Sequence, residues 1–225
     1  MKNRKIIFCI VLILCSFFSV SCNSSVTDKE IYFKSVFEII CKQDGRFDSV
    51  GTGFKTKNGV YTNAHIVSYT QLDEKKVYEQ ISAVVYGTDT IIEMEIVKID
   101  HVKDIAILRP KTETELFESL NALEIADSND IYIGQEIFTI GNLNGYGLAC
   151  NIGIVSSRQK NIERNGAMNK FIQTSIEISK GSSGGPVLSQ EGKVIAMMTF
   201  KVRDSNGEYV DGMSFAIPSN NLDIS

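Results

Sequence analysis

The sequence has no tryptophan, only three prolines and only two histidines among its 225 residues. The two histidines, His65 and His101, lie far apart, and no cysteine–histidine spacing typical of a metal site occurs. We therefore expect no metal and no other cofactor. Basic residues (23) are outnumbered by acidic ones (27) and form no cluster, which argues against a nucleic-acid partner. Internal repeats and low-complexity segments are also missing.

One long hydrophobic run is present, at the amino terminus. A basic stretch over residues 1–5 precedes nearly unbroken apolar residues up to Val20, which predicts a signal peptide over residues 1–21 rather than a spanning helix. Ser19-Val20-Ser21-Cys22 resembles a bacterial lipobox, with Cys22 as the lipidated new terminus, although Ser19 replaces the usual leucine. Ordinary cleavage near Ser21 is the alternative. A lipid would hold the protein on an envelope membrane through acyl chains.

The rest of the chain has the pattern of an all-β fold. Short apolar or alternating runs are separated by turns that often contain glycine, which is typical of a sandwich or barrel. Short helices are expected at 28–35 and 113–123, the second bridging two halves that meet within about 110–130. The expected strands are 35–41, 51–55, 60–62, 81–86, 91–99, 105–108, 136–141, 148–156, 170–175, 186–189, 193–200 and 209–217.

The loop Gly181-Ser182-Ser183-Gly184-Gly185 is the most informative motif. Such a loop can expose a hydroxyl while its backbone N–H groups point at one spot, as acyl transfer requires, or it can be a plain turn. The pattern Gly-x-Ser-x-Gly also fits the nucleophile elbow of α/β-hydrolases, but those enzymes need a histidine after the serine, and both histidines precede it. A base, then an acid, then a serine is the order of the chymotrypsin class.

His65 and Asp104 are the candidate base and acid. The short run Val60 to Thr62 follows the turn pair Asn58-Gly59 and delivers His65 at its end. Asp104 comes directly before an apolar strand, so it is expected to be drawn inward, where it needs a partner. Asp100, its competitor, reads as a solvated turn residue, and His101 as a loop histidine.

Seven segments follow one another along the chain: Gly51-Thr52-Gly53-Phe54, Thr62-Asn63-Ala64-His65, Asp104-Ile105-Ala106, Gly141-Asn142, Gly153-Ile154-Val155-Ser156, Gly181 to Pro186, and Phe215-Ala216-Ile217-Pro218. In this order they resemble the HtrA/Deg serine proteases, which are trypsin-like enzymes of the bacterial envelope. The resemblance covers about residues 34–218. It implies a protease domain over 34–225 after an N-terminal segment 22–33, with two six-stranded antiparallel β-barrels at about 34–110 and 130–218 and the active site in the cleft between them. The family's triad falls on His65, Asp104 and Ser183.

Three features bear on how far the resemblance extends. Ser182 stands where the family usually has asparagine and carries no charge, so activation by a freed amino terminus is not expected. The chain ends soon after Pro218, so no PDZ domain is expected in it. Relatives commonly form trimers through amino-terminal aromatic contacts, for which Ile31, Tyr32 and Phe33 are candidates, although stapling a short helix to the barrel is the interpretation we favour.

The resemblance also indicates the substrate groove. The backbone N–H groups of Gly181 and Ser183 would hold the oxyanion, and the backbone of Thr199 to Lys201 would pair with an extended substrate as an added strand. Counting back from the serine assigns one pocket wall to Glu177, Ile178 and Ser179. Met197 to Phe200 should form the opposite wall, with Met198, Thr199 and Phe200 as the pocket residues.

Two pocket interpretations remain open. An inward Glu177 would favour lysine or arginine in the substrate. Inward Ile178, Met198 and Phe200 would favour small aliphatic residues. A lone buried acid is costly, and Lys180 is near enough in sequence to hold Glu177 outside, so we expect the aliphatic preference.

The function predicted from these patterns is a serine endopeptidase of the bacterial envelope that hydrolyses peptide bonds in unfolded or loosely structured proteins. The alternative is a catalytically silent lipoprotein of the same fold that binds such chains. Leader removal takes Cys9 and Cys15, and beyond the terminal Cys22 the body of the chain keeps Cys41 and Cys150. A bridge between them would cross the barrel interface, so two free thiols are expected.

Overall fold

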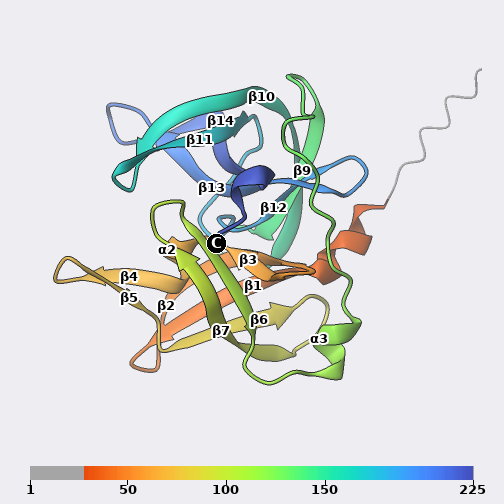
Figure 1. The fold of residues 1–225 in the computed structure, drawn as a ribbon, viewed down its shortest axis with the longest axis vertical. Helices are drawn as coiled ribbons and strands as arrows, with labels where there is room; N and C mark the ends of the chain where they lie inside the picture. The colour runs from red at the N-terminus through yellow and green to blue at the C-terminus, as the bar shows by residue number, and fades with distance from the viewer. Residues whose placement is uncertain (1–27, 225) are drawn as a thin grey trace, which may run out of the picture.

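The chain folds into two closed antiparallel barrels of six strands each (Figure 1). The computed structural model describes residues 28–224, so the signal peptide expected at 1–21 and Cys22 lie outside the described residues. The first barrel has the strand order β1-β2-β3-β8-β7-β6. Its strands are β1 (Val36–Gln43), β2 (Arg46–Thr56), β3 (Gly59–Thr62), β6 (Gln80–Val85), β7 (Ile91–Asp100) and β8 (Ile105–Pro110).

The second barrel closes in the order β10-β11-β14-β13-β12-β9. The double barrel confirms the predicted fold class. Asn165 and Gly166, both at positive φ, form the tight turn between β10 and β11, as the Asn-Gly sequence predicts. The strands are β9 (Glu136–Asn142), β10 (Leu148–Arg164), β11 (Ala167–Thr174), β12 (Pro186–Ser189), β13 (Val194–Arg203) and β14 (Tyr209–Pro218).

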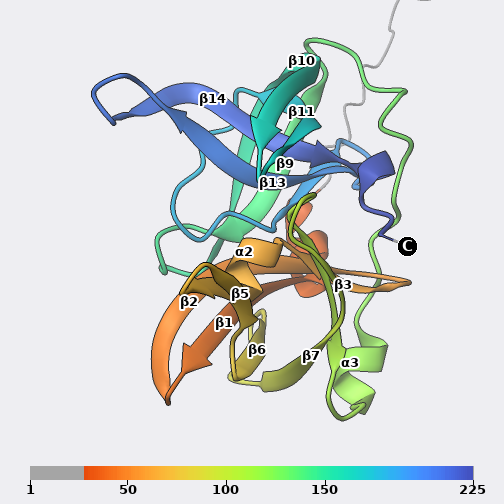
Figure 2. The same ribbon diagram turned by 60° about the vertical axis from the view of Figure 1, so that its left-hand side comes forward.

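Each barrel has its own apolar core, and a third cluster joins them. Phe37, Ile39 and Leu108 are fully buried in the first barrel, and Ile172 and Val187 in the second. The joining cluster combines residues of both barrels, such as Phe54 and Tyr61 with Phe138 and Ile140. This shared cluster fixes one barrel against the other, and loops from both barrels meet along the same seam (Figure 2).

The connection between the barrels is a long segment that contains the short helix α3 (Glu115–Ser119). Thr114 caps it by accepting a hydrogen bond from the N–H of Phe117. At its other end the buried Lys55 donates from Nζ to the carbonyls of Phe117 (2.5 Å) and Leu120 (2.9 Å). Lys55 therefore ties the connecting segment to the first barrel.

The amino-terminal aromatics pack on their own chain. They lie on the 3₁₀ helix η1 (Lys29–Ser35). The rings of Tyr32 and Phe138 are 5.6 Å apart, and those of Phe33 and Tyr86 are 4.8 Å apart. Ile31 is 57% exposed. These contacts are those of a helix packed against the barrels of its own chain. Assembly into a trimer remains a prediction.

Several smaller elements complete the described chain. A polar hairpin of β4 (Ser68–Gln71) and β5 (Glu74–Val77) projects from the first barrel, and a one-turn helix α2 (Ala64–Val67) precedes it. Cys41 is buried and Cys150 is half-buried, and within residues 28–224 the two thiols are not bonded to each other. Within residues 28–224 no helix has the length and apolarity needed to cross a membrane.

Candidate active site

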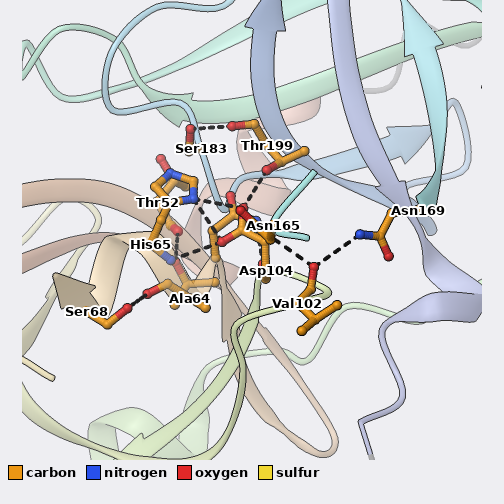
Figure 3. Close-up of polar contacts among 12 residues, drawn as sticks. Thr52, Ala64, His65, Ser68, Val102, Asp104, Asn165, Asn169, Ser183 and Thr199 are labelled. Carbon is orange, nitrogen blue, oxygen red and sulfur yellow. Dashed lines mark hydrogen bonds and ion pairs between the residues drawn. The ribbon is translucent and has the colours of Figure 1, made fainter. Parts of the chain in front are cut away.

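His65 lies on α2, directly after β3. Its neighbours Ala64, Ile66 and Val67 are buried and anchor the single turn, while the imidazole is 41% exposed. The hydroxyl of Ser68 donates to the carbonyl of Ala64 and closes the turn (Figure 3). The fold thus holds the imidazole ring at the seam between the barrels, on a helical turn whose other side chains are buried.

Asp104 lies in the turn between β7 and β8, with φ of +61° and only 4% exposure. Its carboxylate accepts hydrogen bonds from the His65 backbone N–H (3.0 Å), from His65 Nδ1 (2.8 and 2.9 Å to the two oxygens) and from Thr199 Oγ1 (2.8 Å) (Figure 3). The Asp104 carbonyl accepts from Asn63 Nδ2 at 2.9 Å. Side chain and backbone of Asp104 are therefore both fixed.

These donors decide the charge of the pair. Burial would raise the pKa of Asp104, but the hydrogen bonds and charge of His65 and the Thr199 hydroxyl outweigh it and lower the pKa below the ordinary value. An ionised carboxylate can only accept, so Nδ1 of His65 carries the proton of their hydrogen bond. In the neutral ring Nε2 is then a free acceptor, which is the form a general base requires.

The loop that carries Ser183 is held by three backbone and side-chain anchors. Thr52 N–H donates to the Ser183 carbonyl (2.9 Å), and Thr52 Oγ1 donates to the Gly181 carbonyl (2.7 Å). The Lys180 carbonyl accepts from Asn144 N–H (2.8 Å). All three carbonyls are therefore turned toward the protein. Within residues 28–224 the N–H groups of Gly181 and Ser183 have no hydrogen-bond acceptor.

The glycines of this loop permit its close approach to β2 of the first barrel and β9 of the second. Gly181 and Gly184 both have positive φ. A Cβ on Gly184 would lie 2.0 Å from the Thr52 carbonyl oxygen, and one on Gly181 would lie 2.6 Å from the Asn142 oxygen. Asn142 in turn donates from its N–H to Thr52 Oγ1 (2.9 Å). Side chains at these two positions would push the serine loop off the seam.

Thr199 connects the serine to the histidine–aspartate pair. The Ser183 hydroxyl donates to the Thr199 carbonyl at 2.8 Å, and the Thr199 hydroxyl donates to Asp104 (Figure 3). Ser183 Oγ is thus bonded to β13 and not to the ring of His65. In enzymes without substrate such bonds are often long or unformed, so this rotamer does not conflict with a nucleophilic role.

The residues expected to line the primary pocket are not all side by side. Ile178 and Met198 are buried in the same core cluster of the second barrel, whereas Phe200 packs with Phe171 and Phe215 in the joining cluster. Ser179 accepts from the N–H of Ser182 through its carbonyl and is half-buried.

Glu177 is held at the surface and is 55% exposed. Its carboxylate accepts from Lys201 Nζ (2.9 Å) and from the N–H of Gly212. The hydrogen bond from Lys201, followed by that from Gly212, lowers the pKa of Glu177. Lys201 also approaches Asp211 (3.4 Å). Lys201, and not Lys180 as the sequence suggested, is therefore the partner of this acid.

Sequence reasoning did not assign roles to Thr52, Asn63 or the hydroxyl of Thr199. Thr52 and Asn63 lie inside the motifs Gly-Thr-Gly-Phe and Thr-Asn-Ala-His, which were the only signal for them. No group of histidine, cysteine, aspartate and glutamate in the part of the chain the structure describes has the arrangement of a metal site.

Comparisons with known proteins agree with this architecture. The trypsin-like peptidase domain family matches residues 51–197. Protease Do-like 5, chloroplastic, of Arabidopsis thaliana is 33% identical over 183 residues, which are 79% of this chain and 56% of the relative. Serine protease Do-like HtrA of Bacillus subtilis is 28% identical, over 76% of this chain and 37% of its own length.

Among solved structures, the HtrA-type protease AlgW with a tripeptide has the same fold, with a TM-score of 0.70 and 23% identity. The match covers 86% of this chain and 59% of that one. The chain thus spans 56% of the length of the Arabidopsis relative and 37% of the length of the Bacillus relative. It belongs to the trypsin-like peptidase family, and its barrels form a protease domain of the HtrA type.

Proposed function

We propose that this protein is a serine endopeptidase in which Ser183 is the nucleophile, His65 the general base and Asp104 the group that orients and stabilises the imidazolium. The observation that carries the proposal is the fixed His65–Asp104 pair, with Thr199 linking it to Ser183. A rotation of the Ser183 side chain from the Thr199 carbonyl toward His65 Nε2 would complete the proton path.

The reaction then follows the general scheme of acyl transfer. His65 Nε2 takes the proton of Ser183 as Oγ attacks the peptide carbonyl, and it returns that proton to the leaving amine. The free N–H groups of Gly181 and Ser183 hold the developing oxyanion, and loss of one such donor typically costs about 3–4 kcal/mol of transition-state stabilisation. Water then hydrolyses the acyl-enzyme along the same proton path.

For the substrate we propose an extended, loosely structured polypeptide that pairs with β13 at Thr199 to Lys201. An unfolded chain offers such a strand, whereas a folded one must be opened first. For the primary pocket we propose a preference for small aliphatic residues, because Glu177 is occupied by Lys201 and Gly212. Predominant cleavage after lysine or arginine that is lost in Glu177→Ala would overturn this preference.

For location we propose an exported protein of the bacterial envelope, anchored by a lipid on Cys22. Support comes from the leader pattern and from relatives named as probable periplasmic serine endoproteases, such as the DegP-like protein of Halomonas elongata, which is 31% identical over 76% of this chain. Incorporation of a palmitate analogue into the wild type but not into Cys22→Ala tests the anchor, and equal incorporation would reject it.

Casein degradation by purified protein tests the central proposal. Ser183→Ala and His65→Ala are each expected to abolish it while circular dichroism shows that the protein stays folded, because triad residues act as a unit. Undiminished degradation by Ser183→Ala would show that the serine is not the nucleophile.

A further inference from the structure

A small hollow lies beside His65, where the two barrels meet. It offers about 30 Å³ of free space, which is enough for a water molecule or a small polar group. The first barrel supplies most of its wall, and the turn between β10 and β11 supplies the rest. It is lined by Ala64, His65, Ser68, Lys75, His101, Asp104, Arg164 and Asn165.

The charges around this hollow are mainly positive. Lys75 and Arg164 are cationic side chains, and His101 adds an imidazole. None of the three forms an ion pair with another residue in the range 28–224, and the Nε of Arg164 is buried without an acceptor there. The one acid in the lining, Asp104, already accepts from His65 and Thr199. The hollow therefore favours an anionic group.

Arg164 is held in place before any ligand arrives, whereas Lys75 is exposed on the β4–β5 hairpin and donates from Nζ to the hydroxyl of Thr70 (3.0 Å). The Arg164 guanidinium stacks 4.2 Å from the centre of the Phe200 ring. Asn165 and Asn169 donate from Nδ2 to the carbonyl of Val102 at 3.5 and 3.2 Å, which ties the β10–β11 hairpin to the loop of His101 and Asp104 (Figure 3). Preorganised groups lose little further entropy on binding.

The hollow also lies on the path of the proposed substrate strand. Arg164 stacks on Phe200, which is between Thr199 and Lys201, the residues proposed to pair with the substrate. Successive side chains of an extended chain point to opposite faces. If the side chain of the first residue before the cut bond points toward Glu177 to Ser179, the side chain of the second residue before that bond points to the opposite face, toward His65 and Arg164.

We propose that this hollow is a subsite for an acidic side chain of the substrate, aspartate or glutamate, at the second residue before the cut bond or at the fourth, which shares its face. The proposal rests on the endopeptidase function and adds a charge preference to it.

The test uses pairs of fluorogenic peptides built on a sequence that the protein cuts in casein, with glutamate or glutamine at either position. For the wild type, kcat/KM is expected to be about fivefold higher for glutamate, the value of one partly exposed ion pair. The preference should shrink in 1 M salt, where charges more than about 3 Å apart are screened. Arg164→Gln and Lys75→Gln should each bring the ratio toward one, and Arg164→Glu should favour lysine over glutamine.

Lys160→Gln is the matched control, because Lys160 is an exposed cation on the same strand β10 and does not line the hollow. It should keep the wild-type ratio. Equal kcat/KM for glutamate and glutamine at both positions, or a preference that survives in Arg164→Gln and Lys75→Gln, would overturn the subsite while leaving the endopeptidase in place. Absence of any Ser183-dependent cleavage would instead overturn the proposed function, and the subsite with it.

Discussion

Replacing Thr199 by valine removes one hydroxyl from the centre of the proposed active site and leaves the side-chain shape almost unchanged. In the wild type this hydroxyl donates to Asp104 Oδ2 at 2.8 Å, and both residues are buried. A hydrogen bond to a charged group is worth about 1.5–3 kcal/mol. For a domain of this size a loss of about 2 kcal/mol lowers the melting temperature by about 6 °C.

The pH dependence separates this effect from ordinary packing loss. The pKa of Asp104 is lowered in the folded protein, so its stabilising contribution is present above the unfolded pKa and is lost as the pH falls through the folded one. Thr199→Val removes one of the donors that lower this pKa. The destabilisation relative to wild type should therefore be full at neutral pH and should shrink in acid, where the carboxyl is protonated in both proteins.

Thr139→Val is a suitable control, because Thr139 is equally buried but donates to the neutral carbonyl of Pro186 (2.8 Å). Its cost, about 0.5–1.5 kcal/mol, should not change with pH. Denaturant unfolding of both variants between neutral and acidic pH makes the comparison. If the two variants lose the same stability with the same pH profile, the charged hydrogen bond from Thr199 to Asp104 does not contribute as described here.

Two further perturbations test the loop and the cysteines. Gly184→Ala should lower the free energy of unfolding by at least about 2 kcal/mol and remove proteolysis, because the new Cβ would lie 2.0 Å from the Thr52 carbonyl oxygen. Gly145→Ala is the control, since Gly145 also has positive φ but lies in open space, and it should cost about 1 kcal/mol. Equal unfolding free energies for the two variants would contradict the clash. A thiol reagent should modify Cys150 long before Cys41, and mass spectrometry can follow both reactions. The reason is that burial, and after it the charge of Asp48, raises the pKa of Cys41 to about 12. Early modification of Cys41 in the folded protein would refute this order.

Much of the fold could be predicted because its signals are local. Alternating runs and glycine turns indicated most of the barrel strands, such as β7, and the Asn165-Gly166 turn. The hairpin of β4 and β5 was not predicted, because Ser68–Gln71 and Glu74–Val77 are mostly polar and exposed. β10 likewise continues to Arg164 through polar residues, where no apolar pattern marks it.

The site shows the same division between local and long-range information. Chain order was enough to propose His65, Asp104 and Ser183. It did not show that Thr199 joins them, because residues 95 positions apart along the chain meet only after both barrels have formed. For the same reason, proximity in sequence suggested Lys180 as the partner of Glu177, whereas the register of β13 brings Lys201 there.

Labelling with a fluorophosphonate probe tests most directly whether this arrangement activates Ser183. We expect stoichiometric modification of the wild type at Ser183, located by mass spectrometry, much slower modification of His65→Ala and none of Ser183→Ala. Failure of the folded wild type to react under any condition would contradict it and support a silent binding protein of the same fold. Modification that persists in Ser183→Ala would contradict it as well.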